Sequence, residues 1–337
     1  MHELETRPLG RTGMAITRVG FGAWAAGGGQ WRFGWGPQDD ASSVRAIRHA
    51  LERGVNWIDT AAAYGLGHSE QVVGDALAGV GEAERPYVFT KCGLVPSGPD
   101  PMAPPRRVGA GASIRSEVEA SLRRLRVERI DLYQMHWPAE DGTPLEQYWQ
   151  TLCELEREGK IRAAALSNHS VEQLERAEAI GHVHSLQPPF SLVDRRAATE
   201  LIAWCAAHGT GVIVYSPMQS GLLSGGFSRA RAAALDPADW RRHSPEFTGA
   251  ALEANLALAA GLEPVARRHA TSVGAIAVAW TLAWPGVTGA IVGARSPEQV
   301  DGWIDAAGLE LGAEDLEEIA QLVAQTGAGS GPVRPPR

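Results

Sequence analysis

The sequence is poor in cysteine and has no long hydrophobic run. Its three cysteines, Cys92, Cys153 and Cys205, are far apart and odd in number, which argues against a disulfide framework. No stretch reaches the roughly 18 uninterrupted apolar residues that a membrane-spanning helix needs. Residues 1–5 lack the basic-then-apolar pattern of a secretory signal. We therefore predict a soluble, reduced, cytoplasmic protein without a membrane partner.

The chain also lacks an excess of positive charge. Its formal net charge is −8 and its pI is about 5.7, which disfavours nucleic acid or an anionic membrane as the main partner. The local basic pairs Arg123–Arg124 and Arg241–Arg242 have acidic neighbours, so we interpret both as solvated faces. Neither length nor charge decides between a monomer and a homo-oligomer.

Short apolar runs alternate with amphipathic segments along most of the 337 residues. Strands are predicted at 19–21, 55–58, 87–91, 130–135, 161–166, 183–186, 212–215 and 287–292. Helices are predicted after a cap at 39–40, and at 69–77, 113–125, 145–158, 171–180, 197–207, 272–283 and 297–307. Eight strand–helix units indicate parallel strands joined by right-handed crossovers.

This pattern predicts one (β/α)8 TIM barrel domain over residues 1–337, with a core at 7–325 and a disordered tail at 326–337. Gly10 and Gly13 indicate an N-terminal β-hairpin before the first barrel strand. An open dinucleotide-binding sheet is disfavoured, because Gly20-x-Gly22 lacks a third glycine and a following helix. Two long loops, 92–112 and 216–247, leave the carboxyl ends of strands, where barrel enzymes carry their chemistry.

Four polar residues follow predicted strand ends: Asp59 and Tyr64 after the second, Lys91 after the third and His136 after the fourth. Each has an ordinary structural explanation. Asp59 is a possible turn cap, Tyr64 a half-buried surface aromatic, Lys91 a strand-end lysine whose ammonium reaches water, and His136 a hydrogen-bonded histidine. Their convergence at one barrel mouth favours a shared site.

The chemistry of this set is that of proton donation to a carbonyl. A nearby ammonium is expected to lower the pKa of a phenol, a carboxylate keeps the lysine charged, and an imidazole polarises a carbonyl oxygen. Proton donation beside a carbonyl requires a hydride source, which implies a nicotinamide. We find no set of metal ligands in register.

Beyond these four residues, several further stretches carry a family resemblance. They are 9–13, 54–65, 68–70, Lys91, 131–138, 167–168, Gln187, 215–217, 221–223 and 291–299. With them the sequence resembles the aldo-keto reductase superfamily over residues 7–325. Residues 34–40 and 65–70 are similar to its bacterial branch, which includes broad aldehyde, sugar and inositol-related reductases.

The resemblance implies that Tyr64 is the general acid, that Lys91 and Asp59 tune it, and that His136 orients the substrate carbonyl. It places the nicotinamide carboxamide against Ser167, Asn168 and Gln187, its ring on Tyr215, the pyrophosphate along 216–222, and the 2′-phosphate near Arg295. The cofactor-binding positions implied in full are Gly22, Trp24, Asp59, Ser167, Asn168, Gln187, Tyr215, Ser216, Met218, Ser220, Gly221, Leu222, Gly293, Arg295 and Gln299. Tyr215 as strand core and Arg295 as a surface cation remain alternatives.

Two features depart from the family or extend it. The acid and asparagine that usually hold adenine after Gln299 are replaced here by a segment containing Asp301 and Trp303. Tryptophans on the expected mouth loops favour a flat or sugar-like substrate. They are Trp24, Trp31, Trp35 and Trp137.

We therefore expect NADPH-dependent reduction of a small aldehyde or ketone to an alcohol, with NADH possible as the cofactor. The main alternative is an NAD(P)-dependent dehydrogenase that oxidises a sugar or polyol. A less favoured alternative is a cofactor-sensing regulatory subunit.

Overall fold

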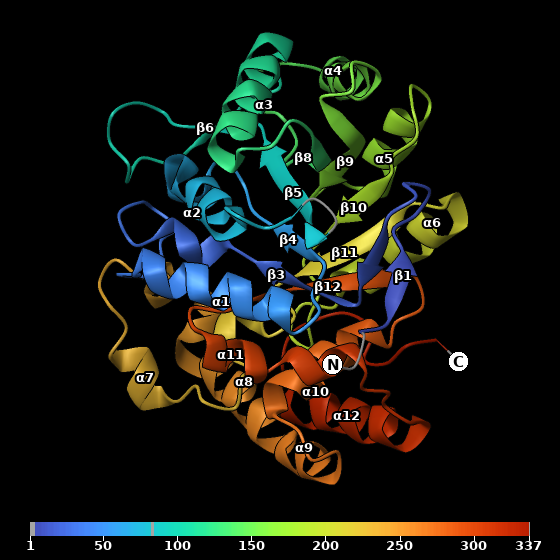
Figure 1. Cartoon of the computed structure of the whole chain (residues 1–337). Helices are drawn as coiled ribbons and strands as arrows, with labels where there is room; N and C mark the ends of the chain where they lie inside the picture. The colour runs from blue at the N-terminus through green and yellow to red at the C-terminus, as the bar shows by residue number, and fades with distance from the viewer. Residues whose placement is uncertain (1–3, 82–83, 337) are drawn as a thin grey trace.

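Parallel strands form a closed barrel with helices on its outside, as Figure 1 shows. The structure is a computed structural model that describes residues 4–81 and 84–336. The barrel strands are β3 (Val19–Gly22), β4 (Trp57–Asp59), β5 (Tyr87–Cys92), β8 (Ile130–Met135), β9 (Ile161–Ser167), β10 (Ser185–Gln187), β11 (Gly211–Tyr215) and β12 (Val287–Gly293). They follow one another in chain order, and β12 pairs with β3 to close the barrel. The predicted (β/α)8 fold is confirmed.

The predicted helices alternate with these strands. They are α1 (Asp40–Glu52), α2 (His68–Leu77), α3 (Gly111–Leu125), α4 (Leu145–Arg157), α5 (Val171–Glu178), α6 (Leu201–His208), α10 (Val273–Leu282) and α11 (Pro297–Asp301). The predicted cap of the first helix is confirmed, since Asp39 accepts a hydrogen bond from the backbone N–H of Ser42. In the described ranges 4–81 and 84–336, no helix combines the length and apolar character needed to cross a membrane.

One predicted helix is interrupted. The segment 297–307 forms α11 and then a separate 3-10 turn, Ile304–Ala307. Between them, the Ser272 hydroxyl donates a hydrogen bond to the Gly302 carbonyl, and the Trp303 side chain is buried. The backbone of Trp303 is not helical, with φ at −139°, so the helix ends before this residue.

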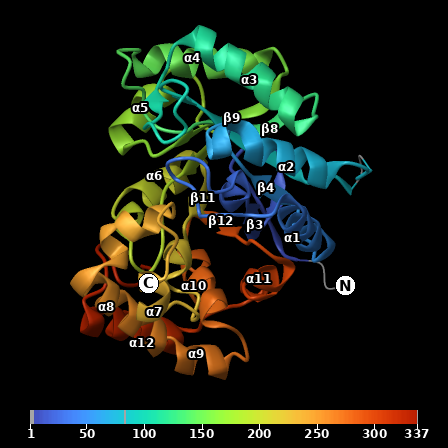
Figure 2. The same ribbon diagram turned by 90° about the vertical axis from the view of Figure 1, so that its left-hand side faces the viewer.

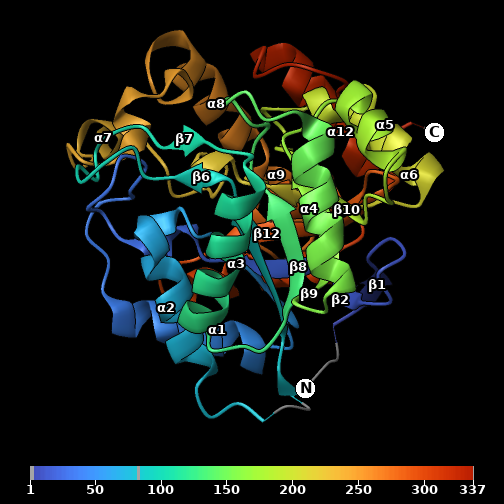
Figure 3. The same cartoon turned by 90° about the horizontal axis from the view of Figure 1, so that it is seen from above.

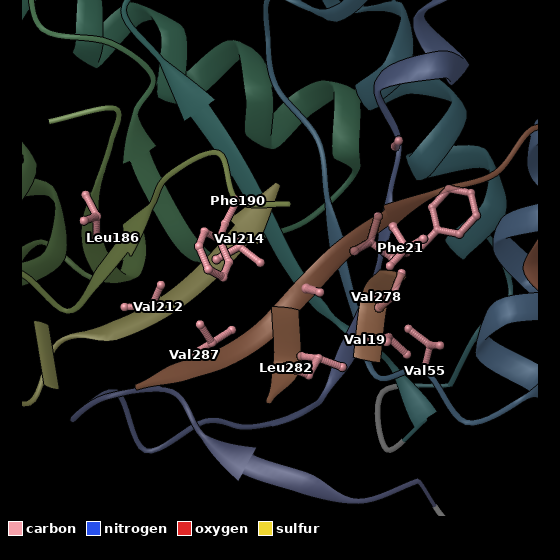
Figure 4. Close-up of a cluster of buried hydrophobic side chains, with 14 of the residues drawn as sticks. Val19, Phe21, Val55, Leu186, Phe190, Val212, Val214, Val278, Leu282 and Val287 are labelled. Carbon is pink, nitrogen blue, oxygen red and sulfur yellow. The ribbon is translucent and has the colours of Figure 1, made fainter. Parts of the chain in front are cut away.

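The period of two along each strand separates the two sides of the barrel wall. Val212 and Val214 belong to the apolar layer between strands and helices, together with Val19 and Phe21 (Figure 4). Ile213, between the two valines, faces the interior instead, where it packs with the cluster that contains Trp57 and Phe89. The wall is therefore apolar on its outer face, and its interior is filled by large side chains.

The N-terminal hairpin covers one end of this interior. Its strands, β1 (Thr6–Pro8) and β2 (Ala15–Thr17), pair in antiparallel fashion, as predicted. Leu9, Met14 and Ile16 are buried in the same inner cluster as Trp57. The amino-terminal end of the barrel is thus closed by apolar packing, which leaves its carboxyl-terminal end for a site.

Several elements lie outside the predicted alternation. They are the hairpin β6 (Leu94–Val95) with β7 (Arg106–Arg107), and the helices α7 (Arg229–Ala233), α8 (Gly249–Gly261), α9 (Glu263–Arg268) and α12 (Ala313–Thr326). Figure 3 shows the hairpin apart from the barrel strands, and Figures 1 and 2 show the four helices gathered on the side opposite α3, α4 and α5. The two predicted long loops therefore contain their own secondary structure.

The chain after α12, where the sequence predicts disorder, is attached to the barrel in this structure. Ser330 forms a parallel bridge with Asp194, and its N–H donates to the carbonyl of Val193. The buried guanidinium of Arg195 donates to the carbonyls of Ala328 and Gly331. These hydrogen bonds hold the segment against the barrel. Its composition, rich in glycine and proline, gives no indication of them.

The close packing inside the barrel predicts the effect of Gly20→Ala. An added Cβ would lie 2.1 Å from Cε2 of Trp57, whose fully buried ring has no room to move. We expect a loss of about 1–3 kcal/mol in the free energy of unfolding, measured by urea denaturation. Gly98→Ala is the control, because no heavy atom lies within 4 Å of the position of its added Cβ. Equal stability of the two variants would contradict the packing described here.

Candidate active site

A cavity of about 560 Å³ opens at the carboxyl-terminal end of the barrel. The same alternation that fills the interior creates its floor. Two residues beyond inward-facing Trp57, Phe89 and Leu132 along their strands lie Asp59, Lys91 and Gln134. A polar layer therefore sits directly on top of the apolar one.

The floor is organised by a buried ion pair between Lys91 and Asp59. The Lys91 ammonium contacts the Asp59 carboxylate and donates to the carbonyl of Thr60 at 2.9 Å. Both side chains are almost completely buried, so Lys91 does not extend its ammonium to water, and Asp59 is the last residue of β4 rather than a turn cap. The two ordinary explanations, a turn cap for Asp59 and a strand-end lysine that reaches water for Lys91, therefore do not describe the structure.

Tyr64 reaches this pair from the loop after β4. Its hydroxyl lies 3.5 Å from Lys91 Nζ, and its ring faces the ammonium with a centroid distance of 5.2 Å. The turn Tyr64–Gly67 is bent, with positive φ at Gly65 and Leu66. A Cβ at Gly65 would lie 2.2 Å from the Gly27 carbonyl oxygen, so only glycine allows the two loops to approach this closely.

The electrostatics differ from the expectation for Tyr64. Burial and the Asp59 charge raise the pKa of the phenol well above its usual value, whereas the sequence analysis expected Lys91 to lower it. The reason is that the ammonium is committed to Asp59, which it contacts more closely than it does Tyr64. Burial also lowers the pKa of Lys91, although Asp59 opposes that shift. The phenol is therefore protonated at neutral pH.

His136 completes the predicted set. It follows β8, and its ring lies edge-on to the Tyr64 ring with a centroid distance of 5.7 Å. Burial, followed by the charges of Lys91 and Arg107, lowers its pKa well below the usual value. A neutral imidazole is the form that donates one hydrogen bond to a carbonyl oxygen without carrying charge.

The residues implied for the nicotinamide form one hydrogen-bonded chain beside Tyr64. Ser167 donates through its hydroxyl to the Gln187 carbonyl at 2.8 Å, and the Asn168 amide donates to the His136 carbonyl at 2.9 Å. The Tyr215 hydroxyl donates to Asn168 Oδ1 at 2.9 Å. All four side chains that were predicted here, including Tyr215, line the cavity, so Tyr215 is not simply strand core.

The other end of the cavity is bordered by the loop after β11 and by the start of α11. Ser216, Gln219 and Ser220 have φ between 44° and 57°, a left-handed conformation that is rare for such residues and that clusters at functional sites. Of the positions predicted in 216–222, Leu222 does not line the cavity. It packs instead in a separate apolar cluster with Phe227 and Phe247.

Arg295 and Gln299 both line this end. Arg295 donates its side-chain hydrogen bonds to Gln38 and to the carbonyls of Trp35 and Pro37, and Gln299 accepts from its backbone N–H. In the segment after Gln299, Asp301 does not line the cavity, because its carboxylate is hydrogen-bonded to His49 and forms an ion pair with Arg53. Trp303 of the same segment does line the cavity.

Two cavity arginines were missed by the sequence analysis, Arg231 and Arg241. Arg241 is buried, pairs with the equally buried Asp239 and stacks over the Trp35 ring at 4.5 Å. Its prediction as part of a solvated face is therefore wrong. Arg124 of the other basic pair is partly exposed, although its guanidinium pairs with fully buried Glu70. A charge pattern in sequence does not show which loop folds back over a pocket.

Aromatic rings form the remaining wall. Trp24, Trp31, Trp35 and Trp137 all line the cavity, as predicted from their loop positions. Trp240, which was not predicted, stacks on Trp24 with ring centroids 5.4 Å apart, and Trp24 in turn stacks on Tyr64 at 6.0 Å. Within residues 4–81 and 84–336, no group of three or more possible ligands is arranged to hold a metal ion.

Comparison with known proteins agrees with this geometry. The profile of the Aldo/keto reductase family matches residues 18–324. The aldo-keto reductase YhdN of Bacillus subtilis is 34% identical over 96% of this chain and 95% of its own length. The NADH-specific methylglyoxal reductase of Escherichia coli is 33% identical over 94% of this chain and 98% of its own. The structure of a glycerol dehydrogenase from Gluconobacter oxydans superimposes with a TM-score of 0.86 at 37% identity, covering 97% and 98% of the two chains.

The chain therefore belongs to the aldo/keto reductase family. It is an oxidoreductase that reduces carbonyl groups with a nicotinamide cofactor.

The buried ion pair predicts how the barrel responds to Asp59→Asn. The substitution leaves the Lys91 ammonium buried without its carboxylate, which typically costs about 3–5 kcal/mol. We expect the double variant Asp59→Asn/Lys91→Met to recover part of this loss in urea denaturation. The control is Glu253→Gln, which removes the exposed partner of Arg229 and should leave the midpoint unchanged. Equal stability of the single and double variants would contradict the assigned ion pair.

Proposed function

We propose that this protein reduces an aldehyde or ketone to an alcohol with NADPH, and that Tyr64 is the general acid. One observation carries the proposal. The Tyr64 hydroxyl lies 3.5 Å from the Lys91 ammonium, beside the neutral His136 ring and at the mouth of a cavity. The resemblance, together with this geometry, supports the four roles proposed from the sequence.

The nicotinamide supplies hydride to the carbonyl carbon when it is bound. His136 and Tyr64 hold the carbonyl oxygen, and Tyr64 Oη gives its proton to that oxygen. The raised pKa of Tyr64 keeps this proton in place at neutral pH, and Lys91 stabilises the phenolate that remains. In the reverse direction the phenolate accepts the proton of an alcohol.

The residues that would hold the nicotinamide ring support the same arrangement. Gln187 Nε2 donates to both Asp59 Oδ2 and Gln134 Oε1, so the amide hydrogens of Gln187 are used inside the barrel. Its Oε1 would then be the atom that accepts from the carboxamide. Ser167 and Asn168, which also line the cavity, would offer polar groups to the carboxamide, and Tyr215 would lie against the nicotinamide ring.

The choice of NADPH rests on the charge at the far end of the cavity. Arg241 is neutralised by Asp239, but the side-chain hydrogen bonds of Arg295 go to uncharged acceptors. Among the described residues, no carboxylate forms an ion pair with Arg295 or Arg231. These two cations suit the 2′-phosphate that distinguishes NADPH from NADH. The Escherichia coli relative is called NADH-specific, so the proposal of NADPH rests on the arginines of this chain and not on that relative.

A second candidate is oxidation of a polyol by the same site. The Gluconobacter oxydans relative is a glycerol dehydrogenase. Hydride and proton transfer use the same groups in both directions, so the concentrations of substrates decide the direction in the cell. The aromatic wall, including Trp24 and Trp137, suits a flat or sugar-like substrate whose apolar face contacts rings.

We also propose a cytoplasmic location and a small-molecule partner. The three cysteines are free, as expected in a reducing cytoplasm. The net charge of −8 favours a small-molecule substrate over nucleic acid.

Removal of the Tyr64 hydroxyl tests the role of the general acid. We expect Tyr64→Phe to lower kcat for a generic aromatic aldehyde by about 10²–10⁴-fold, the usual contribution of general acid catalysis. The affinity for NADPH, measured by quenching of tryptophan fluorescence, should stay close to wild type. Tyr87→Phe is the matched control, since Tyr87 begins β5 and does not line the cavity. Full activity of Tyr64→Phe would remove the assignment.

Replacement of Arg295 tests cofactor preference. Arg295→Ala should weaken NADPH binding by about 10- to 100-fold, the effect of losing charged hydrogen bonds to a phosphate, and leave NADH binding unchanged. Dissociation constants from fluorescence titration give the ratio. Arg229→Ala, which removes an exposed cation outside the cavity, should leave the ratio unchanged. An unaltered ratio in Arg295→Ala would refute the 2′-phosphate site.

A further inference from the structure

Gln134 is a fully buried polar residue in the middle of the barrel floor, and the sequence analysis assigned it no role. It is the fifth residue of β8, where it is paired in register with Lys91 of β5. Its Nε2 donates to Asp59 Oδ2 at 3.1 Å, and its Oε1 accepts from Gln187 Nε2 at 2.9 Å. Gln187 also donates to the same Asp59 oxygen at 2.9 Å.

These hydrogen bonds divide the two oxygens of Asp59 between different partners. Oδ1 contacts the Lys91 ammonium, whereas Oδ2 accepts from both glutamine amides. A closed triangle therefore connects Asp59, Gln134 and Gln187. Asp59 connects this triangle to Tyr64 through Lys91, and Gln187 connects it to the cavity, which its side chain lines.

We propose that Gln134 is a positioning residue that orients the Asp59 carboxylate toward Lys91 and the Gln187 amide toward the cofactor. The inference rests on the proposed function, because it concerns the proton donor and the nicotinamide side of that site. Gln134 itself does not line the cavity, so it acts through its two neighbours.

The direction of its effect on Tyr64 follows from electrostatics. The Asp59 charge disfavours ionisation of Tyr64, and hydrogen bonds to Oδ2 draw part of that charge away from the phenol. Without Gln134, the field of Asp59 at Tyr64 is stronger, and the phenolate forms at higher pH. The titratable groups around this cluster are Asp59, Lys91, Tyr64, His136 and Tyr215. Two further charges act on them, that of Glu70 on Lys91 and that of Arg107 on His136.

A second effect concerns Gln187. With Gln134 present, two hydrogen bonds from Nε2 define the orientation of the Gln187 amide. Loss of the Gln134 acceptor leaves one of these bonds, so the amide is free to turn and its Oε1 no longer points to one place. A residue that served only to fill space would have neither effect.

The decisive variant is Gln134→Leu, which keeps the approximate volume and removes both the donor and the acceptor. We expect the rising limb of kcat/KM against pH, measured for alcohol oxidation with NADP+, to move to higher pH by about half a unit to one unit, which is part of the energy of one hydrogen bond to a charged group because that bond is made to Asp59 and not to Tyr64 itself. We expect NADPH to bind about two- to ten-fold more weakly in fluorescence titration.

Tyr133→Phe is the matched control. Tyr133 is adjacent on β8, is equally buried and packs on the outer side of the wall. The hydrogen bonds of Asp59 and Gln187 in the floor go to Lys91 and Gln134 and to each other, and do not involve the Tyr133 hydroxyl. It should change neither readout. If Gln134→Leu fails to fold, Gln134→Met, with an unbranched chain of similar length, takes its place.

The outcomes separate this inference from the proposed function. An unchanged pH limb and unchanged cofactor affinity in an active, folded Gln134→Leu protein would overturn the role of Gln134 alone. If wild type binds NADPH but turns over neither aldehydes nor alcohols, the proposed function fails. The affinity of Gln134→Leu then decides the inference: weaker binding supports the positioning of Gln187, and equal binding refutes it.

Discussion

The contact between the Lys91 ammonium and the Asp59 carboxylate inside the barrel is the constraint on which the site depends. Placing two charges away from water is costly, and their attraction compensates only when the remaining lone pairs and hydrogens find partners. Here Thr60, Gln134 and Gln187 supply those partners from three different strands or their ends. The barrel must therefore be closed and in register before the charges are tolerated.

The same constraint explains how the site is protonated. Because Asp59 holds the ammonium, Tyr64 experiences burial and a carboxylate more strongly than it experiences a cation, and its pKa rises. His136 is kept neutral by burial and by the charge of Lys91. A site with one neutral donor, one neutral imidazole and one compensated ion pair has little net charge of its own. It can therefore accept a polar carbonyl without a counter-ion.

The cavity joins this polar floor to a cationic end, and the two are connected by loops rather than by the barrel. Trp240 and Arg241 are neighbours in one loop. The first stacks on Trp24 near Tyr64, whereas the second donates to the carbonyl of Ser220 in the strained segment after β11. Any movement of this loop therefore affects both ends. The contact from Arg241 is made at Ser220, one of the residues with an uncommon backbone angle.

The sequence alone was enough to predict the barrel fold and the residues at its mouth. Periodicity identified the eight strand–helix units, since buried strands need short apolar runs and surface helices need an apolar face. Polar residues at strand ends identified Asp59, Tyr64, Lys91 and His136, because parallel strands in a barrel bring their carboxyl ends to one face. The resemblance added the cavity-lining positions around Ser167, Gln187 and Arg295, although their roles remain proposals.

Only the tertiary structure decided which side chains meet once the barrel closes. Gln134 looked like one polar residue in an apolar strand, and its partners lie 75 and 53 residues away in the chain. Arg241 looked like part of an exposed basic pair until its loop folded over the cavity, and α12 lay outside the repeating pattern. The direction of the pKa shift of Tyr64 also required three dimensions, because it depends on whether Lys91 lies closer to the phenol or to Asp59. Sequence spacing determines the face of a strand on which a residue lies, but contact distances across a closed barrel are set by packing.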